Sequence, residues 1–436
     1  MENSNGMNNL DLSKVNLIYF IGIGGIGISA IARMMLLEGK KVAGSDSSQS
    51  EVTEELSKIG AEIFIGQKAE NLKEGIDLVV YTIAITPENL EFVKAKELGI
   101  KMVSYPEMLG IISADKYTIA VSGTHGKTTT TAMIAKVMID AGLDPTVIVG
   151  SLLKDHKSNF IAGKSKYFVV EACEYRRSFL NLSPKILVIN NIDNDHLDYY
   201  KDIADIQSAF KELAMKIPED GCLVCNVSDE LLKPIIESVK CKVIDYVSGF
   251  EKLNLKVPGN HNQSNANVAI KVLEILGIEK EKTIKSLEDF SGTWRRFEYK
   301  GETKNGALIY DDYGHHPTEI EATLLGAKEM FPDKNIVAIF QPHLFSRTKI
   351  LAEQFGKCFK NVSEVILAPI YAAREVDDGS YNSEMLAKEI EKNGEKVSVL
   401  KTFENIVSYL STLDKPNTVF ITIGAGDIYK VCHKIN

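Results

Sequence analysis

Residues 121–131 read Val-Ser-Gly-Thr-His-Gly-Lys-Thr-Thr-Thr-Thr, and their types and spacing suit the binding of a nucleotide triphosphate. Gly123 and Gly126 let the backbone bend so that its N–H groups, and the N-terminus of the helix that follows, face a polyphosphate. Lys127 can then reach the outer phosphates, and the Thr128 hydroxyl can hold Mg²⁺. The full P-loop pattern begins with a glycine, and this chain has Val121 at that position. A turn that only caps a helix has no use for the Lys-Thr pair, so the segment predicts a site for ATP and Mg²⁺.

Two neighbouring apolar segments deliver polar side chains that can join this site. The strand expected at residues 167–170 ends at Glu171, and the strand expected at residues 186–189 is followed by a polar run that contains Asp195 and His196. The carboxyl ends of parallel strands open on one edge of a sheet, so these side chains can converge on a bound triphosphate. A carboxylate and an imidazole there suit metal ligation and charge neutralisation in phosphoryl transfer. Helix capping by Asp193 or Asp195 is the alternative interpretation.

A second glycine-rich turn lies near the N-terminus. An apolar strand expected at residues 15–21 enters a turn with glycines at Gly22, Gly24, Gly25 and Gly27, and a helix follows. A short strand at residues 41–43 then leads to Asp46, which lies 19 residues after the last of these glycines. This layout is that of a dinucleotide-binding βαβ unit. Because the same turn accepts any pyrophosphate, the residues alone do not decide whether the ligand is NAD or another pyrophosphate.

A third group of chemically capable residues follows two strands near the C-terminus. The strand expected at residues 307–310 leads to His315 and His316, and the strand expected at residues 336–340 leads to His343 and Arg347. Such clustering favours substrate binding. A zinc site is the alternative, but the spacing of the residues matches no standard ligand set.

Three successive α/β units must position these groups, and the 436-residue length agrees with about three domains. We expect a Rossmann-like domain at residues 1–113, a central parallel sheet of the P-loop ATPase type at residues 114–296, and a second Rossmann-like domain at residues 297–436. Hydrophobic content of 44% and charged content of 25% are those of an ordinary globular protein.

The charge and cysteine patterns limit the kinds of binding partner and the cellular compartment that we expect. The net charge of −9 and the absence of a long basic run argue against nucleic-acid binding. No apolar stretch approaches the ~20 residues of a membrane span, and the first ten residues are polar, so we expect a cytoplasmic protein. Cys222 and Cys225 form a CxxC, but their strand-like setting favours buried thiols over metal or redox chemistry.

The ordered motifs of the chain resemble those of the Mur ligases over essentially its whole length. They are GTHGKTTTT at 123–131, EACEYRRSFL at 171–180, NNIDNDHLDYY at 190–200, PGNHN at 258–262, RRFE at 295–298, YDDYGHHPTEI at 310–320 and FQPHLFSRTK at 340–349. Within that family the set is similar to the branch that joins L-alanine to the carboxylate of UDP-N-acetylmuramate, in the cytoplasmic stage of peptidoglycan synthesis. The resemblance implies an acyl-phosphate intermediate, with ADP and phosphate as products, in a monomer or a weak homodimer.

The resemblance also implies a role for each domain and each motif. The N-terminal turn would hold the pyrophosphate of the UDP-sugar and no NAD, the middle domain would bind ATP, and the C-terminal domain would bring the amino acid. Residues of the sugar site would be Gly22, Gly24, Gly25, Gly27, Asp46 and Thr82. Residues of the ATP site would be Gly123, Thr124, His125, Gly126, Lys127, Thr128, Thr129, His261, Asn262, Asn265, Arg296 and Asp312. Thr128, Glu171 and His196 would hold Mg²⁺.

For the amino acid, a bidentate guanidinium suits a carboxylate and a neutral imidazole can accept a proton. We therefore expect Arg347 to pair with the alanine carboxylate, and His315 or His343 to lie near the attacking amine. Three features depart from the family pattern: Gln67 after Gly66, the pair Tyr81-Thr82 in place of two serines, and a short segment between Tyr246 and Pro258. The first two leave the uridine and ribose contacts open.

Three other functions compete with this interpretation. A recycling ligase that adds an intact peptide to the UDP-sugar would share the P-loop and the EACE strand, although FQPHLFSRTK favours a single alanine. An NAD-dependent oxidoreductase would explain residues 15–46 but would leave the P-loop without a role. A nucleotide-gated regulatory protein would bind ATP without turnover.

Overall fold

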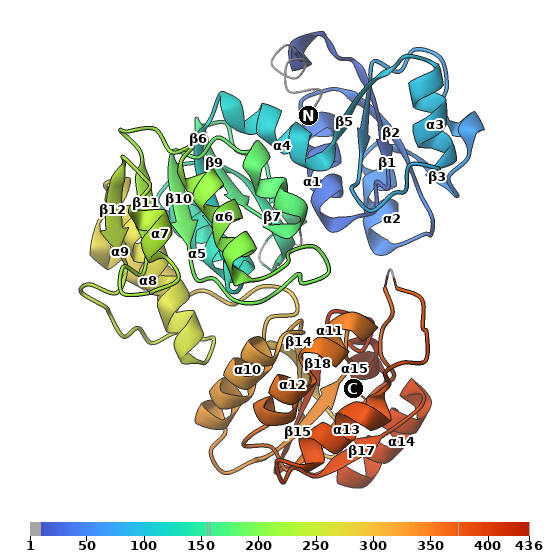
Figure 1. Ribbon diagram of the computed structural model, residues 1–436, viewed down its shortest axis with the longest axis vertical. Coiled ribbons are helices and arrows are strands. Elements are labelled where there is room, and N and C mark those ends of the chain that lie inside the picture. The colour runs from blue at the N-terminus through green and yellow to red at the C-terminus, as the bar shows by residue number, and fades with distance from the viewer. Residues whose placement is uncertain (1–9, 155, 157, 374, 436) are drawn as a thin grey trace.

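The computed structural model describes residues 10–154, 156, 158–373 and 375–435, and it contains three sheets that follow one another along the chain (Figure 1). Most strand pairs are parallel, and helices cover the sheet faces, so the predicted α/β architecture with three units is confirmed. The exact domain boundaries after residues 113 and 296 stay predictions. The polar start of the chain, residues 1–9, lies outside the described residues. Among the described residues, no helix combines the length and apolarity that crossing a bilayer requires.

The N-terminal sheet has the strand order β3-β2-β1-β4-β5, with every neighbouring pair parallel. Its strands are β1 (Leu17–Ile21), β2 (Lys41–Asp46), β3 (Glu62–Ile65), β4 (Leu78–Tyr81) and β5 (Lys101–Ser104). Its helices are α1 (Ile26–Leu37), α2 (Glu51–Lys58), α3 (Leu90–Glu97) and α4 (Tyr105–Ala114). The strand order reverses between β1 and β4, and ligands of doubly wound sheets bind at such a point. The glycine turn after β1 lies there.

One expected strand was too short. The strand predicted at residues 41–43 continues to Asp46, because Gly44 and Ser45 pair with Phe20 and Ile21 of β1. A Cβ at Gly44 would lie 2.6 Å from the Phe20 carbonyl oxygen, so the close strand contact requires glycine. A glycine is usually a sign that a strand ends, which is why the sequence prediction stopped before it. Asp46 therefore ends β2 itself and points its carboxylate at the glycine turn.

The central sheet has the order β12-β11-β10-β6-β9-β7-β8 and is parallel except for the β7–β8 hairpin. Its strands are β6 (Tyr117–Ser122), β7 (Thr146–Leu153), β8 (Ser158–Ile161), β9 (Tyr167–Glu171), β10 (Ile186–Ile189), β11 (Cys222–Cys225) and β12 (Lys242–Asp245). Its helices are α5 (Lys127–Asp140), α6 (Ile203–Ala214), α7 (Lys233–Ile236), α8 (Asn260–Ile275) and α9 (Lys280–Glu288). Because β6 lies between β10 and β9, the P-loop turn after β6 has the ends of both neighbours beside it.

Alternating side chains of the central strands belong to two cores. Ile119 and Val121 of β6 face a core shared with α5 and α8, whereas Ala120 faces a core shared with α6. Successive side chains of a strand point to opposite faces, so both faces of this sheet are buried around its central strands, which are mostly apolar. The second core is continuous with that of the N-terminal sheet, because α1 packs on β7 and β8.

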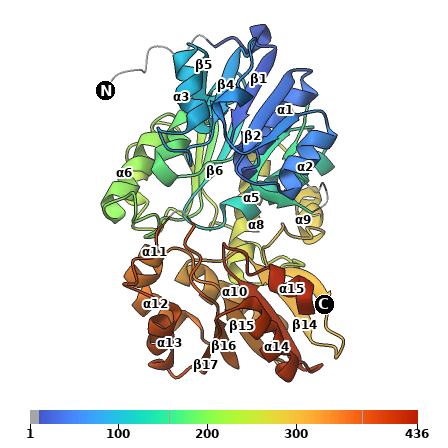
Figure 2. The same ribbon diagram turned by 90° about the vertical axis from the view of Figure 1, so that its right-hand side faces the viewer.

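The C-terminal sheet has the order β13-β14-β18-β15-β16-β17, antiparallel only between β13 and β14. Its strands are β13 (Glu298–Glu302), β14 (Leu308–Asp312), β15 (Asn335–Phe340), β16 (Glu364–Leu367), β17 (Val397–Val399) and β18 (Thr418–Ile423). Its helices are α10 (Pro317–Met330), α11 (Phe345–Ile350), α12 (Ala352–Cys358), α13 (Ser383–Glu391), α14 (Phe403–Leu413) and α15 (Lys430–Ile435). This domain lies below the other two in Figure 2, and α10 contacts α8 across the junction.

Candidate functional site

The P-loop turn has the backbone shape that its glycines predict. Gly123 and Gly126 have φ angles of 126° and 81°, which residues with a Cβ rarely adopt. A Cβ at Gly123 would lie 2.9 Å from the side chain of Asn190, so the turn also packs too tightly for a larger residue. Gly126 is the N-cap of α5, and the helix N-terminus therefore opens at this turn. Unpaired N–H groups and the helix dipole make it a place for anions.

Lys127 is held in the turn by three acceptors. Its ammonium donates to the carbonyl oxygens of Gly123 and Thr124 at 2.6 and 2.9 Å, and its distance to the Glu174 carboxylate is 2.9 Å. Burial alone would lower the pKa of Lys127, but the neighbouring acidic groups, Glu174 foremost, together outweigh burial and raise that pKa above the usual value. The side chain therefore carries a full positive charge at the point where the phosphates are expected.

The three residues predicted to hold Mg²⁺ lie around the same turn. The Thr128 hydroxyl donates to both oxygens of Glu171 at 3.1 and 2.9 Å, and the Gly150 N–H donates to the same carboxylate at 2.7 Å. His196 Nε2 lies 3.6 Å from Glu174, and the buried His196 Nδ1 has no hydrogen-bond partner in the described part of the chain. A hydroxyl, a carboxylate and an imidazole nitrogen that makes no hydrogen bond are groups that could join a cation site.

A cavity of ≈ 370 Å³ opens beside the turn, between α8, the loop after β10 and the start of the C-terminal domain. Its lining includes the five residues that the sequence assigned to the nucleotide from outside the P-loop: His261, Asn262, Asn265, Arg296 and Asp312. The structure thus brings together residues from two domains, as predicted. Their individual contacts with a nucleotide stay predictions.

Several of these side chains are fixed before any ligand arrives. Asn262 donates to the Pro258 carbonyl at 2.7 Å, and Asn265 accepts from the Thr130 hydroxyl at 3.1 Å. The Asp312 carboxylate accepts from the Phe297 N–H at 2.8 Å. Burial lowers the pKa of His261, although the Asp312 charge opposes the shift, so the ring is neutral near pH 7. These bonds hold Asn262, Asn265 and Asp312 in place in the cavity wall.

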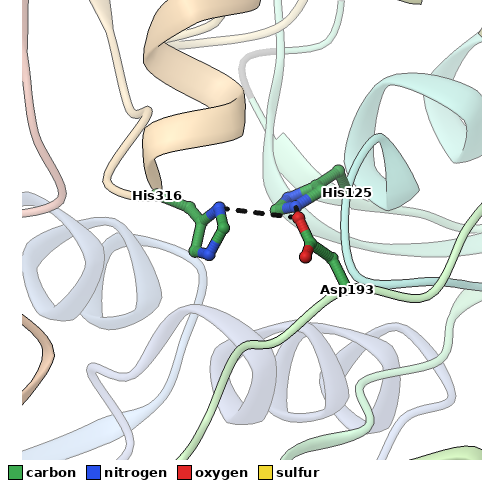
Figure 3. A group of neighbouring side chains, drawn as sticks. All are labelled: His125, Asp193 and His316. Carbon is green, nitrogen blue, oxygen red and sulfur yellow. Dashed lines mark hydrogen bonds and ion pairs between the residues drawn. The ribbon is translucent and has the colours of Figure 1, made fainter. Parts of the chain in front are cut away.

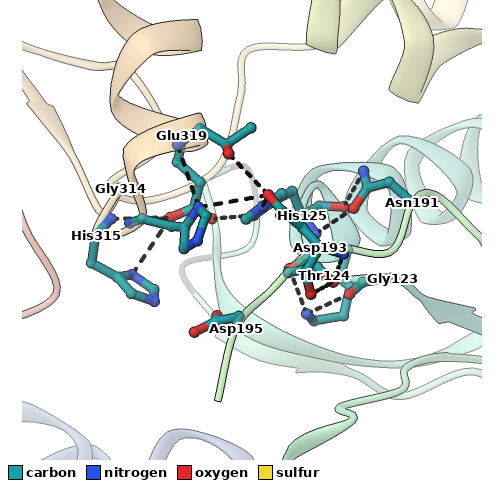
Figure 4. A network of polar contacts seen from close by, with 12 residues as sticks. Gly123, Thr124, His125, Asn191, Asp193, Asp195, Gly314, His315 and Glu319 are labelled. Carbon is teal, nitrogen blue, oxygen red and sulfur yellow. Dashed lines mark hydrogen bonds and ion pairs between the residues drawn. The ribbon is translucent and has the colours of Figure 1, made fainter. Parts of the chain in front are cut away.

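The P-loop also contacts the C-terminal domain through His125 (Figure 4). His125 Nε2 lies 3.0 Å from Asp193 Oδ2, and its Nδ1 lies 3.4 Å from Glu319 Oε1 of α10. Burial alone would lower the pKa of His125, but hydrogen bonds to Asp193 and Glu319 outweigh it and raise that pKa to about 9. The Thr318 hydroxyl adds a bond of 2.9 Å to Asp193. These contacts join the two domains beside the nucleotide cavity.

Arg347 makes a second connection between the domains. Its Nη2 donates to Asp195 Oδ1 at 2.9 Å, and both side chains are only 8% exposed. Its Nη1 lies 3.3 Å from His343 Nδ1. The sequence did not predict the pairing with Asp195, because Arg347 is expected to bind a substrate carboxylate. Asp193 and Asp195 do not cap α6, whose N-cap is Asp202, so the capping interpretation of both aspartates is wrong for that helix.

His315 and His343 lie on the same side of this junction. Their ring centroids are 6.0 Å apart. A small pocket beside Arg347 is lined by Asp195 and His196, and neither His315 nor His343 lines it. Burial lowers the pKa of His315 to about 4 despite the nearby Glu319 carboxylate, so the imidazole is neutral near pH 7. Its Nδ1 lies 3.1 Å from the Tyr313 carbonyl oxygen, which can only accept, so Nδ1 carries the proton and Nε2 the lone pair.

The N-terminal glycine turn lines a separate, open cavity of ≈ 570 Å³. Gly22, Gly25, Asp46 and Thr82 line it, and Gly24 donates its N–H to Asp46 at 2.9 Å. Gly27 is packed under the ring of Tyr105, with only 2.6 Å between its hypothetical Cβ and the ring. Four of the six predicted sugar-site residues thus line the cavity at the switch point of the first sheet, whereas Gly24 and Gly27 do not line it. What these residues bind stays a prediction.

Sequence reasoning missed three acidic residues that organise the site: Glu174, Asp193 and Glu319. Glu174 pairs with Lys127, and the other two pair with His125. Each lies inside a motif that was recognised, but a motif does not say which of its carboxylates faces which cation. The spacing of Glu319 three residues after His316 was a usable signal, because it forms a capping box at the start of α10.

Comparisons with known proteins match all three domains. Family models described as "Mur ligase family, catalytic domain", "Mur ligase middle domain" and "Mur ligase, glutamate ligase domain" match residues 17–117, 121–251 and 295–426. The chain is 46% identical to the UDP-N-acetylmuramate–L-alanine ligase of Clostridium kluyveri, covering 97% of this chain and 98% of that protein. It is 44% identical to the protein of the same name from Clostridium tetani, covering 96% and 97%.

Solved structures share the arrangement. The UDP-N-acetylmuramate-alanine ligase of Thermotoga maritima has a TM-score of 0.81 and 29% identity, covering 96% of this chain and 97% of that one. A murein peptide ligase of Psychrobacter arcticus has a TM-score of 0.73 with 23% identity, covering 96% and 98%, and this likeness concerns the fold alone.

Proposed function

The chain belongs to the Mur ligase family, and we propose that it joins L-alanine to the carboxylate of UDP-N-acetylmuramate, converting ATP to ADP and phosphate. The observation that carries this proposal is the 46% identity, over nearly the full length of both chains, to an enzyme with that name. The nucleotide cavity and the N-terminal cavity support it, because each is lined by groups that suit its proposed ligand.

The need for ATP follows from the chemistry of the acid. A carboxylate is a poor acyl donor until one oxygen becomes part of a good leaving group. In the proposed reaction, the muramyl carboxylate oxygen attacks the γ-phosphorus and ADP leaves, which gives an acyl phosphate. The alanine nitrogen then attacks the acyl carbon, phosphate leaves, and the nitrogen loses a proton as the amide forms.

We propose that Lys127 neutralises the β- and γ-phosphates. In this structure the ammonium is bonded to its own turn and to Glu174, so it must leave at least one of these acceptors to contact a phosphate. Glu174 is then placed to contact His196, whose Nε2 lies 3.6 Å from it. Thr128, Glu171 and His196 are the proposed holders of Mg²⁺, which would offset the phosphate charge when bound.

For the amine, we propose His315 as the nearby proton acceptor in preference to His343. Its Nε2 carries the lone pair, and its lowered pKa of about 4 keeps the ring neutral. Arg347 is the proposed partner of the alanine carboxylate. Since it is bonded to Asp195 here, binding of alanine exchanges one carboxylate for another at the same guanidinium.

The test is phosphate release by the purified protein with each substrate omitted in turn, followed by a panel of amino acids. We expect release only when UDP-N-acetylmuramate, ATP, Mg²⁺ and alanine are all present, with product mass equal to the alanyl amide. Glycine and serine should be discriminated by only ~1 to 3 kcal/mol, because a single small group limits selectivity. Preference for an intact tripeptide would instead support the recycling ligase, and release without the sugar or the amino acid would contradict the ligase.

We further propose that the enzyme acts in the cytoplasm, in the soluble stage of peptidoglycan synthesis, as a monomer or weak homodimer. The net charge of −9 agrees with small-molecule substrates and with no nucleic-acid partner. Sedimentation at several protein concentrations measures the oligomeric state directly.

A further inference from the structure

Two histidines and an aspartate converge where the central and C-terminal domains meet (Figure 3). His125 comes from the P-loop turn, Asp193 from the loop after β10, and His316 from the N-cap of α10. Asp193 Oδ2 lies 3.0 Å from His125 Nε2 and 3.8 Å from His316 Nδ1. The three ligand atoms all lie within 4.8 Å of one another, and among the described residues this is the one such group of His, Cys, Asp and Glu.

The outer nitrogen of each histidine is held by an oxygen acceptor. His316 Nε2 lies 3.1 Å from the Asn194 carbonyl oxygen, and His125 Nδ1 lies 3.4 Å from Glu319 Oε1. A carbonyl can only accept, so His316 carries its proton on Nε2 and has its lone pair on Nδ1, facing Asp193. Neutral His125, with its proton on the Glu319 side, presents its Nε2 lone pair to the same point. Metal-binding histidines are oriented by such outer acceptors.

We propose that His125, Asp193 and His316 form a binding site for a divalent cation of the zinc class that bridges the two domains. Four-coordinate zinc at ~2.0 to 2.1 Å from nitrogen and oxygen places neighbouring ligand atoms about 3.3 to 3.4 Å apart. The observed separations of 3.0 and 3.8 Å bracket that value. Two imidazoles suit zinc and not Mg²⁺, which prefers oxygen ligands. This site is therefore distinct from the proposed Mg²⁺ site at Thr128 and Glu171.

The cation has to displace competing hydrogen bonds and a proton. Thr318 donates its N–H to His316 Nδ1 at 3.3 Å and its hydroxyl to Asp193 Oδ2 at 2.9 Å. His125 faces Asp193, Glu319 and His316, and the two carboxylates that stabilise its proton also stabilise a dication in its place. Binding is therefore best measured near pH 8, where proton release is less costly.

Occupation of this site connects the P-loop directly to α10. A metal bound to both sides opposes separation of the domains, and it fixes His125 in the turn that is proposed to hold the ATP phosphates. Zinc should therefore inhibit turnover at concentrations too low to replace Mg²⁺ on ATP.

The binding test uses metal-free full-length protein without nucleotide, titrated with Zn²⁺ against a fluorescent zinc chelator. We expect one zinc per chain. The change His316→Asn should weaken binding on the order of 100-fold, because asparagine keeps the N-cap of α10 but is a poor zinc ligand. His433→Asn, which changes an exposed histidine of α15, is the matched control and should leave the affinity unchanged.

Further variants locate the metal. Glu319→Gln removes the carboxylate behind His125 and should weaken zinc about 10- to 100-fold. Glu171→Gln should have no effect, whereas loss of zinc in that variant would place the ion at the proposed Mg²⁺ site and overturn the proposal. X-ray absorption should show nitrogen and oxygen at ~2.0 to 2.1 Å and no sulfur near ~2.3 Å. If His316→Asn bound zinc as tightly as the wild-type protein, that result would also overturn the proposal. The measurement needs no substrate, so its failure would leave the proposed ligase activity untouched.

Discussion

The ion pair between Arg347 and Asp195 makes a quantitative prediction about domain association. The pair joins the C-terminal and central domains, its Nη2–Oδ1 distance is 2.9 Å, and both side chains are 8% exposed. The Asp195 pKa lies well below its usual range; burial opposes this, but the charges of His196 and Arg347 outweigh it. The carboxylate is therefore ionised at every physiological pH.

The perturbation is Asp195→Asn, which keeps the shape and keeps the Oδ1 acceptor for the His196 N–H at 2.7 Å. Breaking a buried pair costs ~3 to 5 kcal/mol when the remaining charge stays buried. In Asp195→Asn, Arg347 can reach water if the domains separate, so its charge need not stay buried and unpaired. The variant then loses only the difference between a charged and a neutral hydrogen bond, together with the incomplete solvation of Arg347 in the closed arrangement. We expect this loss to be about 2 kcal/mol. That free energy lowers the ratio of closed to open molecules on the order of 30-fold.

Hydrogen exchange of the backbone at residues 193–200 and 343–350 measures the opening, since Asp195 and Arg347, which lie in these segments, are both buried at this junction. Protection should fall in Asp195→Asn and stay unchanged in Asp198→Asn, which removes an exposed charge from the same loop. A double-mutant cycle with Arg347→Met should give a coupling energy of about 2 kcal/mol. Equal protection in Asp195→Asn and Asp198→Asn would refute the reasoning.

The same variants separate the two roles of Arg347. If Arg347 also binds the alanine carboxylate, Arg347→Met should raise the KM for alanine at least about tenfold more than Asp195→Asn does, because only the first change removes the guanidinium. Equal KM values in the two variants would mean that Arg347 acts only as a connection between domains.

Three further outcomes test the proposed sites. Lys127→Ala should abolish phosphate release. It should leave the affinity for the UDP-sugar, measured by calorimetry, unchanged, because the glycine turn at residues 22–27 belongs to another sheet. A loss of sugar affinity in this variant would contradict the proposal of two separate sites. Gly27→Ala should weaken sugar binding and lower stability by ~1 to 3 kcal/mol in thermal unfolding, since its Cβ would lie 2.6 Å from the Tyr105 ring. Thr128→Val should raise the Mg²⁺ concentration for half-maximal rate about tenfold, and an unchanged requirement would count against Thr128 as a ligand.

The sequence predicted several buried inner strands closely, but it did not predict the inner strand β7 or several edge strands. The predicted bounds 186–189 match β10, whose residues are all buried, and the strand predicted at 336–340 matches β15 to within one residue. The strands β3, β12 and β17 were not predicted, and each lies at the edge of its sheet. Their side chains are mostly half-buried or exposed, so neither an apolar run nor a clean alternation identifies them. A parallel strand that is buried on both faces has a continuous apolar run, and that run is what allows it to be predicted from the sequence.

In the candidate site, the contacts within one sheet could also be predicted from the sequence, whereas the contacts between domains could not. The neighbours of the P-loop followed from strand order, because parallel strand ends share one edge. The pairs that join the domains, Arg347 with Asp195 and His125 with Glu319, connect residues 152 and 194 positions apart. Their partners depend on how the C-terminal domain is oriented, and no local pattern of residues encodes that orientation.

The junction between those domains explains how two adjacent arginines acquire different roles. Arg295 has a φ of 57° and is buried, and its guanidinium contacts Asp311 at 2.7 Å and the carbonyl oxygens of Gly426 and Gly424 at 3.0 and 2.6 Å. These bonds fix the connecting segment to the C-terminal sheet. Arg296 is thereby directed into the nucleotide cavity, 3.9 Å from Glu319. The RRFE motif does not distinguish the two arginines, and the structure gives them different surroundings. Arg295 therefore fixes the connecting segment that holds the charge of Arg296 at the cavity.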